Sequence, residues 1–463
     1  ERFTHRRTLP SAPERRCHRY LRIIVHIDFT SGDVGKKILL FSLPLMVGNV
    51  FQQLYNVVDT LVVGKFLGEA PLAAVGSAYT LMIFLTSILI GLTMGCSVYF
   101  SLCFGRKNFY RMRQSIFISF LSIGLLTIVM NGAVYILLDG LISFMQVPSE
   151  VIPYIRDYLW WIFAGLWAVF LFNFGAALLR AVGDSVTPLI FLILSSLMNV
   201  VLDILFVVYL DFGVAGAAQA TVISQYVSGV GIFIDCFFRK DFHISRKDMV
   251  WSRQVFCDMS ELSLLTSLQQ SIMNFGILLV QGLVNSFGTT VMAAFAAGVK
   301  IDTIAYSPLQ DFGNAFSTYV AQNYGAGNRD RIRRGILTAG KMIFIFSLLA
   351  SSIVSFLAPG LMGFFVPETA VEVIAVGSHY LRIEGSCYLG IGILFMLYGF
   401  YRAVKRAAMS VVLTILSLGS RVVLAYVLSS FPEIGVTGIW LSIPIGWALA
   451  DMYGIIKGYK LVR

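Results

Sequence analysis

Long, uninterrupted runs of apolar residues fill most of the chain, and short polar segments separate them. About 20 apolar residues are enough to cross the hydrocarbon core of a bilayer, and many of these runs are longer. They do not alternate between apolar and polar positions as the strands of an outer-membrane barrel do, so the pattern predicts membrane-spanning helices. Twelve spans are predicted, at residues 38–64, 71–104, 114–145, 151–179, 186–210, 214–238, 255–286, 289–323, 335–362, 370–402, 407–430 and 434–458.

The second half of this pattern repeats the first half in the same direction. The offset between matching residues stays between 220 and 222 positions, and six spans fall in each copy. The matching pairs include Leu72–Ala78 with Met292–Gly298, Gly105–Ile116 with Gly325–Ile336, and Gly213–Gly216 with Gly435–Gly438. Such duplications are typical of transporters whose two lobes move against each other. We therefore predict an all-α integral membrane protein with twelve transmembrane helices in two six-helix lobes, related by an internal parallel repeat.

The predicted organisation places the first lobe at residues 30–238, a linker at 239–254 and the second lobe at 255–463. Residues 1–29 are rich in arginine and hold no apolar run long enough for a signal sequence, so they are predicted to be a disordered extension.

Composition and charge agree with a membrane protein. The chain is 57% hydrophobic and 13% charged, with a mean hydropathy of +0.79. Its net charge of +10 comes from lysines and arginines that nearly all fall on one side when twelve helices are threaded alternately. The positive-inside rule then predicts that both termini are cytoplasmic. The basic residues lie in short loops between spans, so they indicate contact with an anionic bilayer and no nucleic-acid partner.

The motifs of ATP-driven transport and of metal enzymes are missing from the sequence. It contains no phosphate-binding loop, and its six cysteines show no zinc spacing. We therefore expect no catalytic residues, no enzyme activity and no cofactor. Transport would then draw on an ion gradient.

Buried carboxylates are the candidate ion site. Asp59 lies in the first predicted span and Asp203 in the fifth, four residues after Asn199 and on the same helix face; Thr221 lies in the sixth. An aspartate at the centre of a membrane helix costs about 3 kcal/mol, so such residues are rarely without function. Two carboxylates, an amide and a hydroxyl suit Na⁺, and the same carboxylates could instead carry protons. The alternative for each residue is a hydrogen bond to a neighbouring helix.

Several segments together resemble the multidrug and toxic compound extrusion (MATE) transporters, in particular the bacterial branch. They are Phe41–Met46, Phe51–Asp59, Leu72–Gly76, Leu179–Asp184, Thr187–Pro188 and Gln322–Gly327. The resemblance covers residues 30–460. It implies a V-shaped pair of lobes that exports organic cations or amphiphiles by rocker-switch antiport with Na⁺ or H⁺. It also implies a cation site, with Na⁺ as a possible occupant, at Asp59, Asn199, Asp203 and Thr221. Pro44 matches the proline at which the first helix bends, although a static kink would explain it equally well.

The second lobe departs from the family pattern. Some members carry a carboxylate pair on the seventh and tenth helices. Here the seventh span offers only amides, and the tenth has Glu384 near its outer end, so a sodium site of that type is not expected. Lys300, Asp302, Asp311 and Arg421 are present instead. Lys300, Asp302 and Arg421 either form a self-neutralising ion-pair network, or Asp302 or Asp311 binds the substrate cation or a second proton.

The substrate is expected to be a small cationic or amphiphilic molecule, handled by a monomer. The candidate cavity residues are Gln53, Tyr55, Asn56, Gln270, Asn274, Lys300 and Asp302. Two other functions stay open: a lipid-linked oligosaccharide flippase of the same superfamily, and an intramembrane transferase enzyme.

Overall fold

The computed structural model describes residues 26–144, 148–367 and 369–462, and within these ranges it contains helices and no β-strand. The first half holds α2 (Val34–Phe66), α3 (Glu69–Gly105), α4 (Phe109–Ile136), α5 (Leu138–Phe144), α6 (Ile152–Ala164), α7 (Leu166–Ala181), α8 (Val186–Asp203), the π-helix η1 (Ile204–Tyr209), α9 (Gly213–Phe238) and the 3₁₀-helix η2 (Lys240–Phe242). The second half holds α10 (Arg253–Asn285), α11 (Thr289–Gly325), α12 (Arg329–Gly363), α13 (Val371–Gly385), α14 (Tyr388–Ala403), α15 (Ala407–Ser429) and α16 (Val436–Val462).

The helices reproduce the predicted spans. In the described part of the chain, nine helices are long and apolar enough to cross a membrane, and two bent helix pairs raise the number to eleven. These pairs are α6 with α7, bent by 40°, and α13 with α14, bent by 51°. The remaining long helix, α11, has 37 residues but carries Lys300, Asp302 and Asp311. It is long enough to span the bilayer, so the twelve predicted spans each have a structural counterpart.

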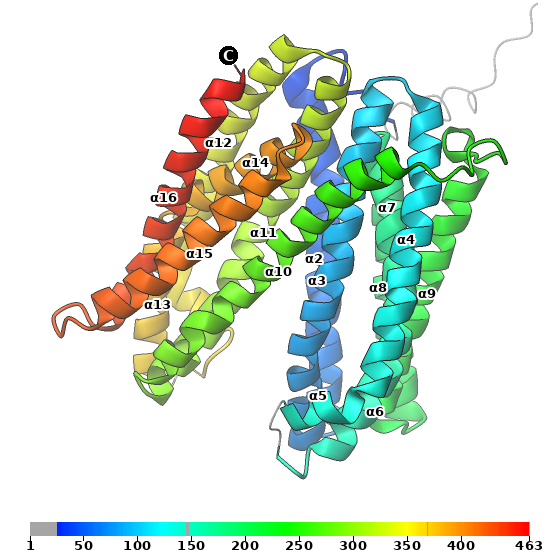
Figure 1. Cartoon of the computed structure of the whole chain (residues 1–463). Coiled ribbons are helices and arrows are strands. Elements are labelled where there is room, and N and C mark those ends of the chain that lie inside the picture. The colour runs from blue at the N-terminus through cyan, green and yellow to red at the C-terminus, as the bar shows by residue number, and fades with distance from the viewer. Residues whose placement is uncertain (1–25, 145–147, 368, 463) are drawn as a thin grey trace, which may run out of the picture.

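The two halves form two bundles that approach each other at one end of the molecule and diverge toward the other (Figure 1). The first lobe contains α2 to α9 and the second α10 to α16. We call the end at which α2 begins and α16 finishes the basic end, because the loops there carry most of the lysines and arginines. The opposite end, where α3 begins and α10 finishes, is called the open end. The two-lobe fold predicted from the repeat is confirmed.

Glycines allow the backbones of the two lobes to touch where α3 packs against α10 and α11, toward the basic end. We call this contact between the lobes the seam. A Cβ atom built on Gly95 of α3 would lie 2.4 Å from Cα of Ser263 in α10. One built on Gly105, at the end of α3, would lie 2.0 Å from the carbonyl oxygen of Gln322 in α11. Small residues let two membrane helices pack closely, and close packing matters there because the hydrophobic effect does not drive helices together in lipid. The seam therefore depends on specific glycines.

A short segment before α2, residues 27–32, crosses this seam at the basic end, and we call it the strap. The amide of Ile27 donates a hydrogen bond of 3.0 Å to the carbonyl of Gly183 in the first lobe. The Phe29 ring is fully buried and lies edge-on to Phe41 and to Tyr319 of α11. The predicted boundary at residue 30 therefore cuts through a packed segment, and Ile27–Phe29 belong to the folded body. The disorder predicted for residues 1–25 falls outside the described residues.

The predicted linker is anchored to the first lobe by Asp248. Its carboxylate accepts hydrogen bonds of 2.9 Å from the amide and hydroxyl of Ser245 and forms a 3.1 Å ion pair with Arg113 of α4. Burial raises the pKa of Asp248, but these partners outweigh it and hold the pKa below its ordinary value. The group thus stabilises the fold above the pKa of the unfolded carboxyl, and this contribution is lost as pH falls through the lowered folded value.

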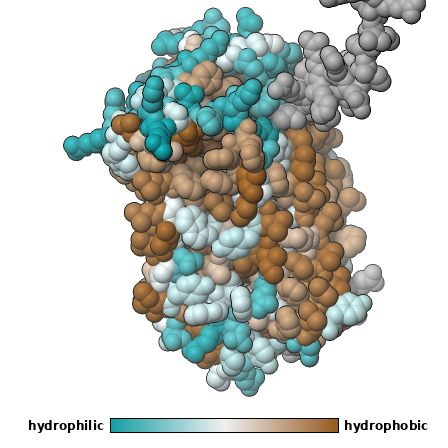
Figure 2. Space-filling view, turned by 90° about the vertical axis from the view of Figure 1, so that its right-hand side faces the viewer, coloured by the Kyte–Doolittle hydropathy of each residue, from teal (hydrophilic) through white to brown (hydrophobic). Residues whose placement is uncertain are grey.

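The outer face of the first lobe is apolar over its middle and polar at its two ends (Figure 2). Exposed leucine, isoleucine and valine side chains supply the apolar face, among them Leu125 and Val129 of α4, Leu194 and Val201 of α8, and Val227 and Ile234 of α9. A face of this kind is stable only against lipid. The chain is therefore a multi-pass membrane protein.

Candidate functional site

Three helices bring the four predicted cation-site residues together in the first lobe. Asp59 comes from the last third of α2, Asn199 and Asp203 from the last turns of α8, and Thr221 from α9. All four are buried, and Asp203 is fully buried. The Asn199 amide donates a 3.2 Å hydrogen bond to the Thr221 hydroxyl, and the charges of Asp59 and Asp203 are close enough to interact. The sequence prediction that these residues are neighbours therefore agrees with the structure.

Most of the oxygens in this cluster have no protein partner. Among the described residues, one carboxylate oxygen of Asp59, both oxygens of Asp203 and the amide oxygen of Asn199 are buried without a hydrogen bond. A buried carboxylate without a partner is strongly destabilising unless a proton or cation neutralises it. The arrangement consequently provides hard oxygen ligands for a small cation and equally provides two sites for protons. The described residues contain no group of three or more acidic, histidine or cysteine side chains that could hold a metal ion.

The local backbone at Asp203 is unusual. The α-helical geometry of α8 ends at Asp203, and the next six residues form the π-helix Ile204–Tyr209. A π-helical turn inside a membrane helix rearranges the backbone and is frequent at functional sites. The run Ile204–Tyr209 is uniformly apolar, so its sequence gives no signal for this turn. Tyr55 and Tyr158 complete the surroundings, since both interact electrostatically with Asp59 and Asp203.

Pro44 lies inside α2, ten residues after the helix begins, and α2 continues through it as one helix to Phe66. The bend predicted at this proline during transport therefore stays a prediction. The neighbouring Gly48 lies against Leu192 and Leu189 of α8, so this part of α2 packs directly on the helix that carries Asn199 and Asp203.

The second lobe contains an acidic pair that the sequence did not predict. Asp302 of α11 and Glu384 of α13 are both buried and hydrogen-bond each other, and Tyr388 donates a 2.7 Å hydrogen bond to Asp302. The second oxygen of Glu384 has no partner among the described residues. Tyr380 also hydrogen-bonds Glu384, and Arg421 lies close enough for its charge to act on both acids.

One sequence expectation about this lobe is wrong: Glu384 lies in the middle of the tenth span, at the break between α13 and α14, and not near its outer end. Lys300 is exposed and forms no ion pair with Asp302 among the described residues. Of the two cations proposed for a neutralising network, Arg421 is the one whose charge acts on Asp302 and Glu384. The Gly-Ser-Cys sequence at 385–387 is the signal for the break, because small residues there let the helix bend next to a carboxylate.

Asp311, the other acid of α11, faces the first lobe across the seam. It is within hydrogen-bonding reach of Asn49 of α2, and Arg180 of α7 is its nearest charge. One of its oxygens has no partner among the described residues. Asp311 lies apart from the Asp302 and Glu384 pair, and its interaction with Asn49 connects α11 of the second lobe to α2 of the first.

The predicted cavity residues fall into two groups. Gln53, Tyr55 and Asn56 are partly buried in the last half of α2, and the Asn56 amide donates a 3.4 Å hydrogen bond to Gln53. Gln270 is buried and Asn274 partly buried on α10. The residues of the first group precede Asp59 by three to six positions on α2. They therefore lie between the buried ion cluster and the exposed surface of that helix.

Comparisons with known proteins place this architecture in one family. The sequence model of the MatE family matches residues 44–205 and again 265–427, one match in each repeat and together more than half of the chain. The probable multidrug resistance protein YpnP of Bacillus subtilis is 29% identical over 395 residues, covering 84% of this chain and 87% of that protein. The probable multidrug resistance protein NorM of Thermotoga maritima is 24% identical, covering 88% and 89%.

A solved outward-facing structure of a MATE family multidrug resistance transporter gives the same fold. It superposes with a TM-score of 0.89 at 25% identity, covering 94% of this chain and 97% of that one. Its lobes are those of the repeat described above, and the family model matches each repeat separately. The chain belongs to the MatE family of multidrug and toxic compound extrusion transporters.

Proposed function

We propose that the chain is a secondary active multidrug efflux transporter that exchanges organic cations or amphiphiles for H⁺ or Na⁺. The observation that carries the mechanism is the set of buried oxygens without partners on Asp59, Asn199 and Asp203. Such a set is stable when a cation or protons occupy it and unfavourable when it is empty. Binding there can therefore bias the equilibrium between two conformations. The relatives named above are multidrug resistance proteins, and this disfavours the flippase and transferase alternatives.

The orientation in the membrane follows from the charges. The basic end, with both termini, lies in the cytoplasm of a bacterial cell and faces the anionic inner leaflet. The open end then faces outward, as in the outward-facing relative. The transporter works as a monomer, since the two repeats of one chain supply both lobes.

Gradient-driven exchange in proteoliposomes tests this function. The purified transporter is reconstituted, ΔpH and a Na⁺ gradient are imposed separately, and efflux of ethidium is followed by fluorescence. We expect one of the two gradients to drive efflux. Equal ethidium movement in protein-free liposomes, or no response to either gradient, would contradict antiport.

The acidic pair of the second lobe supports a second, separable role. Asp302 and Glu384 share a hydrogen bond, and a hydrogen bond between two carboxyl groups requires a proton on one of them. We propose that this pair binds a second proton or the positive group of the substrate.

Replacing Glu384 by glutamine tests this role. We expect Glu384→Gln to lower efflux to about a third or less of the wild-type rate, since it fixes the pair in one protonation state. The loss should depend on the external pH, which a purely structural defect would not do. Glu433→Gln, in the exposed turn between α15 and α16, is the matched control and should keep the wild-type rate. If the efflux rate of Glu384→Gln falls equally at every external pH, the acidic pair has only a structural role.

A further inference from the structure

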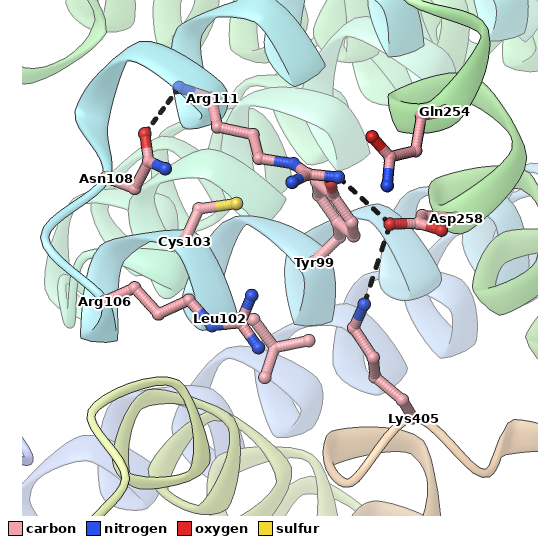
Figure 3. A pocket seen from close by; sticks show the side chains of 9 residues that line it. All are labelled: Tyr99, Leu102, Cys103, Arg106, Asn108, Arg111, Gln254, Asp258 and Lys405. Atoms are coloured by element: carbon pink, nitrogen blue, oxygen red, sulfur yellow. Dashed lines mark hydrogen bonds and ion pairs between the residues drawn. The ribbon is translucent and has the colours of Figure 1, made fainter.

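A cavity of about 240 Å³ lies at the basic end, between the two lobes, and the cation cluster described above does not involve it. Its walls come from α3 and the start of α4 in the first lobe, and from the start of α10 and the turn between α14 and α15 in the second (Figure 3). The lining residues are Tyr99, Leu102, Cys103, Arg106, Asn108, Arg111, Gln254, Asp258 and Lys405.

The cavity has more positive charge and more hydrogen-bond donors than its own residues can satisfy. The lining contains three cations, Arg106, Arg111 and Lys405, and one carboxylate, that of Asp258. Arg111 donates to Asp258 at 3.1 Å, whereas the Lys405 ammonium is 3.8 Å away (Figure 3). The side chains of Arg106 and Gln254 make no hydrogen bond or ion pair to any described residue. Unpaired donors around a cavity favour an anionic ligand.

The internal repeat shows that one of these cations occupies a costly backbone position. Lys405 matches Gly183 of the first lobe at the offset of 222, and both follow an Arg-Ala-Val sequence. Gly183 has φ +88°, and Lys405 keeps the same left-handed turn with φ +59°. A residue with a side chain pays about 1 kcal/mol for this conformation, which glycine avoids. Lys107, which matches Gly327, holds the same kind of turn outside the cavity, so what distinguishes Lys405 is that its side chain lines the charged cavity.

The second repeat also shows what normally fills the matching site. Arg331, on α12, is the counterpart of Arg111 at the offset of 220, and it donates hydrogen bonds of 3.0 Å to the carbonyl oxygens of Phe29, Ser31 and Gly32 in the strap. Tyr319 likewise corresponds to Tyr99. In the second lobe, oxygens of the polypeptide thus surround the arginine. In the first lobe, the corresponding Arg111 donates to the Tyr99 hydroxyl at 3.0 Å and to one carboxylate oxygen of Asp258 at 3.1 Å, and the rest of its guanidinium borders the cavity.

We propose that the cavity binds a phosphate group, with Arg106, Arg111 and Lys405 as its ligands. A tetrahedral phosphate supplies the several acceptor oxygens that arginine recognises, as the strap carbonyls do for Arg331. Each water-sized group needs about 30 Å³, so the cavity holds a phosphate with several waters. The group can be free phosphate or the headgroup of an anionic phospholipid at this face of the membrane.

Binding would couple to conformation, because the ligands come from different lobes. Arg106 and Arg111 belong to the first lobe and Lys405 to the second. A phosphate between them holds the seam closed at the basic end and favours the conformation seen here. This inference does not require the proposed antiport, since it concerns binding and stability alone.

Thermal unfolding of the purified full-length transporter tests the site. With inorganic phosphate at 10 to 50 mM, we expect the melting temperature to rise by about 2 °C or more over chloride at equal ionic strength. Lys405→Gly should lose this response and still fold, because glycine is the residue at the matching turn of the first lobe. Arg106→Gln should lose it as well. Asp258→Asn should strengthen phosphate binding about fivefold, since it removes the opposing charge.

Lys107→Gly is the matched control. Lys107 also holds a left-handed turn, with φ +56°, and corresponds to Gly327, but it does not line the cavity. It should keep the phosphate response.

Thermal unfolding in nanodiscs of phosphatidylcholine, with and without phosphatidylglycerol, identifies the source of the phosphate group. A rise in melting temperature with phosphatidylglycerol that Lys405→Gly abolishes indicates a lipid headgroup. A rise with inorganic phosphate alone indicates the free ion. If neither arm responds, or if Lys405→Gly responds like the wild type in both, the proposal is wrong.

Discussion

Asp59→Asn is expected to reduce gradient-driven efflux to about a tenth or less of the wild-type rate while leaving the protein folded. Asp59 carries a buried carboxylate oxygen with no partner among the described residues, so its charge is available for an ion and is not required by a neighbouring helix. The amide side chain has the same shape but cannot bind a proton or balance a cation. Without ion binding there is no differential affinity to drive the conformational change. Asp203→Asn should behave in the same way, because both of its oxygens lack partners. Efflux of ethidium from proteoliposomes measures the loss.

A matched control is Asp139→Asn, because Asp139 is an exposed acid at the open end, paired with Arg156. It should transport at the wild-type rate. Size-exclusion profiles and melting temperatures of Asp59→Asn should match the wild type, since removing an unpaired buried charge does not destabilise a fold. Wild-type efflux by Asp59→Asn would overturn the assignment of the ion site to the first lobe.

Variants of the two neutral residues of the cluster, Asn199 and Thr221, distinguish Na⁺ from H⁺ as the coupling ion. If Na⁺ is the ion, Asn199→Ala should weaken the response to Na⁺, because the amide oxygen without a partner would be a ligand. If H⁺ is the coupling ion, the two carboxylates can bind it without the amide, and Asn199→Ala should keep most of the response to ΔpH. Thr221 would show the same contrast, since its hydroxyl accepts the hydrogen bond from Asn199.

Periodicity and the repeat were enough to predict the helices and the two lobes, because long apolar runs have few alternatives in a bilayer. The first-lobe cluster was also predictable. Asn199 and Asp203 share a helix face at a spacing of four residues, and buried acids are rare enough to stand out. The sequence alone was enough to predict which four residues form this cluster. The π-helix after Asp203 was not predictable, because its six apolar residues would equally form an α-helix.

The second-lobe pair shows the limit of reading one helix at a time. Asp302 and Glu384 are 82 positions apart in the chain, and they meet where α11 packs against α13, beside the 51° bend of the tenth span. Bending is a tertiary property that depends on the neighbours of both helix segments. The strap was missed for a related reason: its stability comes from contacts with residues about 300 positions away, such as Asn323 and Arg331.

Gly95→Ala is expected to prevent the basic end from closing as it does here. The added methyl would lie 2.4 Å from Cα of Ser263 and 2.7 Å from the Leu262 carbonyl oxygen, and neither backbone atom can move independently of α10. Overpacking of this kind costs about 1 to 3 kcal/mol, which shifts a two-state equilibrium by about 5- to 150-fold. This outweighs the gain of about 1 kcal/mol that alanine brings to a helix interior over glycine. The shift should favour the conformation in which the basic end is open, and efflux should fall because the conformation seen here is depopulated.

Cys96 reports the shift directly, because it follows Gly95 on α3, is fully buried, and its sulfur lies 3.2 Å from the hydroxyl of the same Ser263. In a background with Cys17, Cys103, Cys257 and Cys387 replaced by serine, maleimide labelling of Cys96 should be about fivefold faster or more in Gly95→Ala than in the parent. Gly132→Ala on α4 is the matched control, because a methyl there meets no atom within 4 Å. It should label slowly and transport normally. Equal labelling of Cys96 in the two alanine variants would mean that α3 and α10 do not need this close contact, so that another part of the seam, such as the strap, closes the basic end.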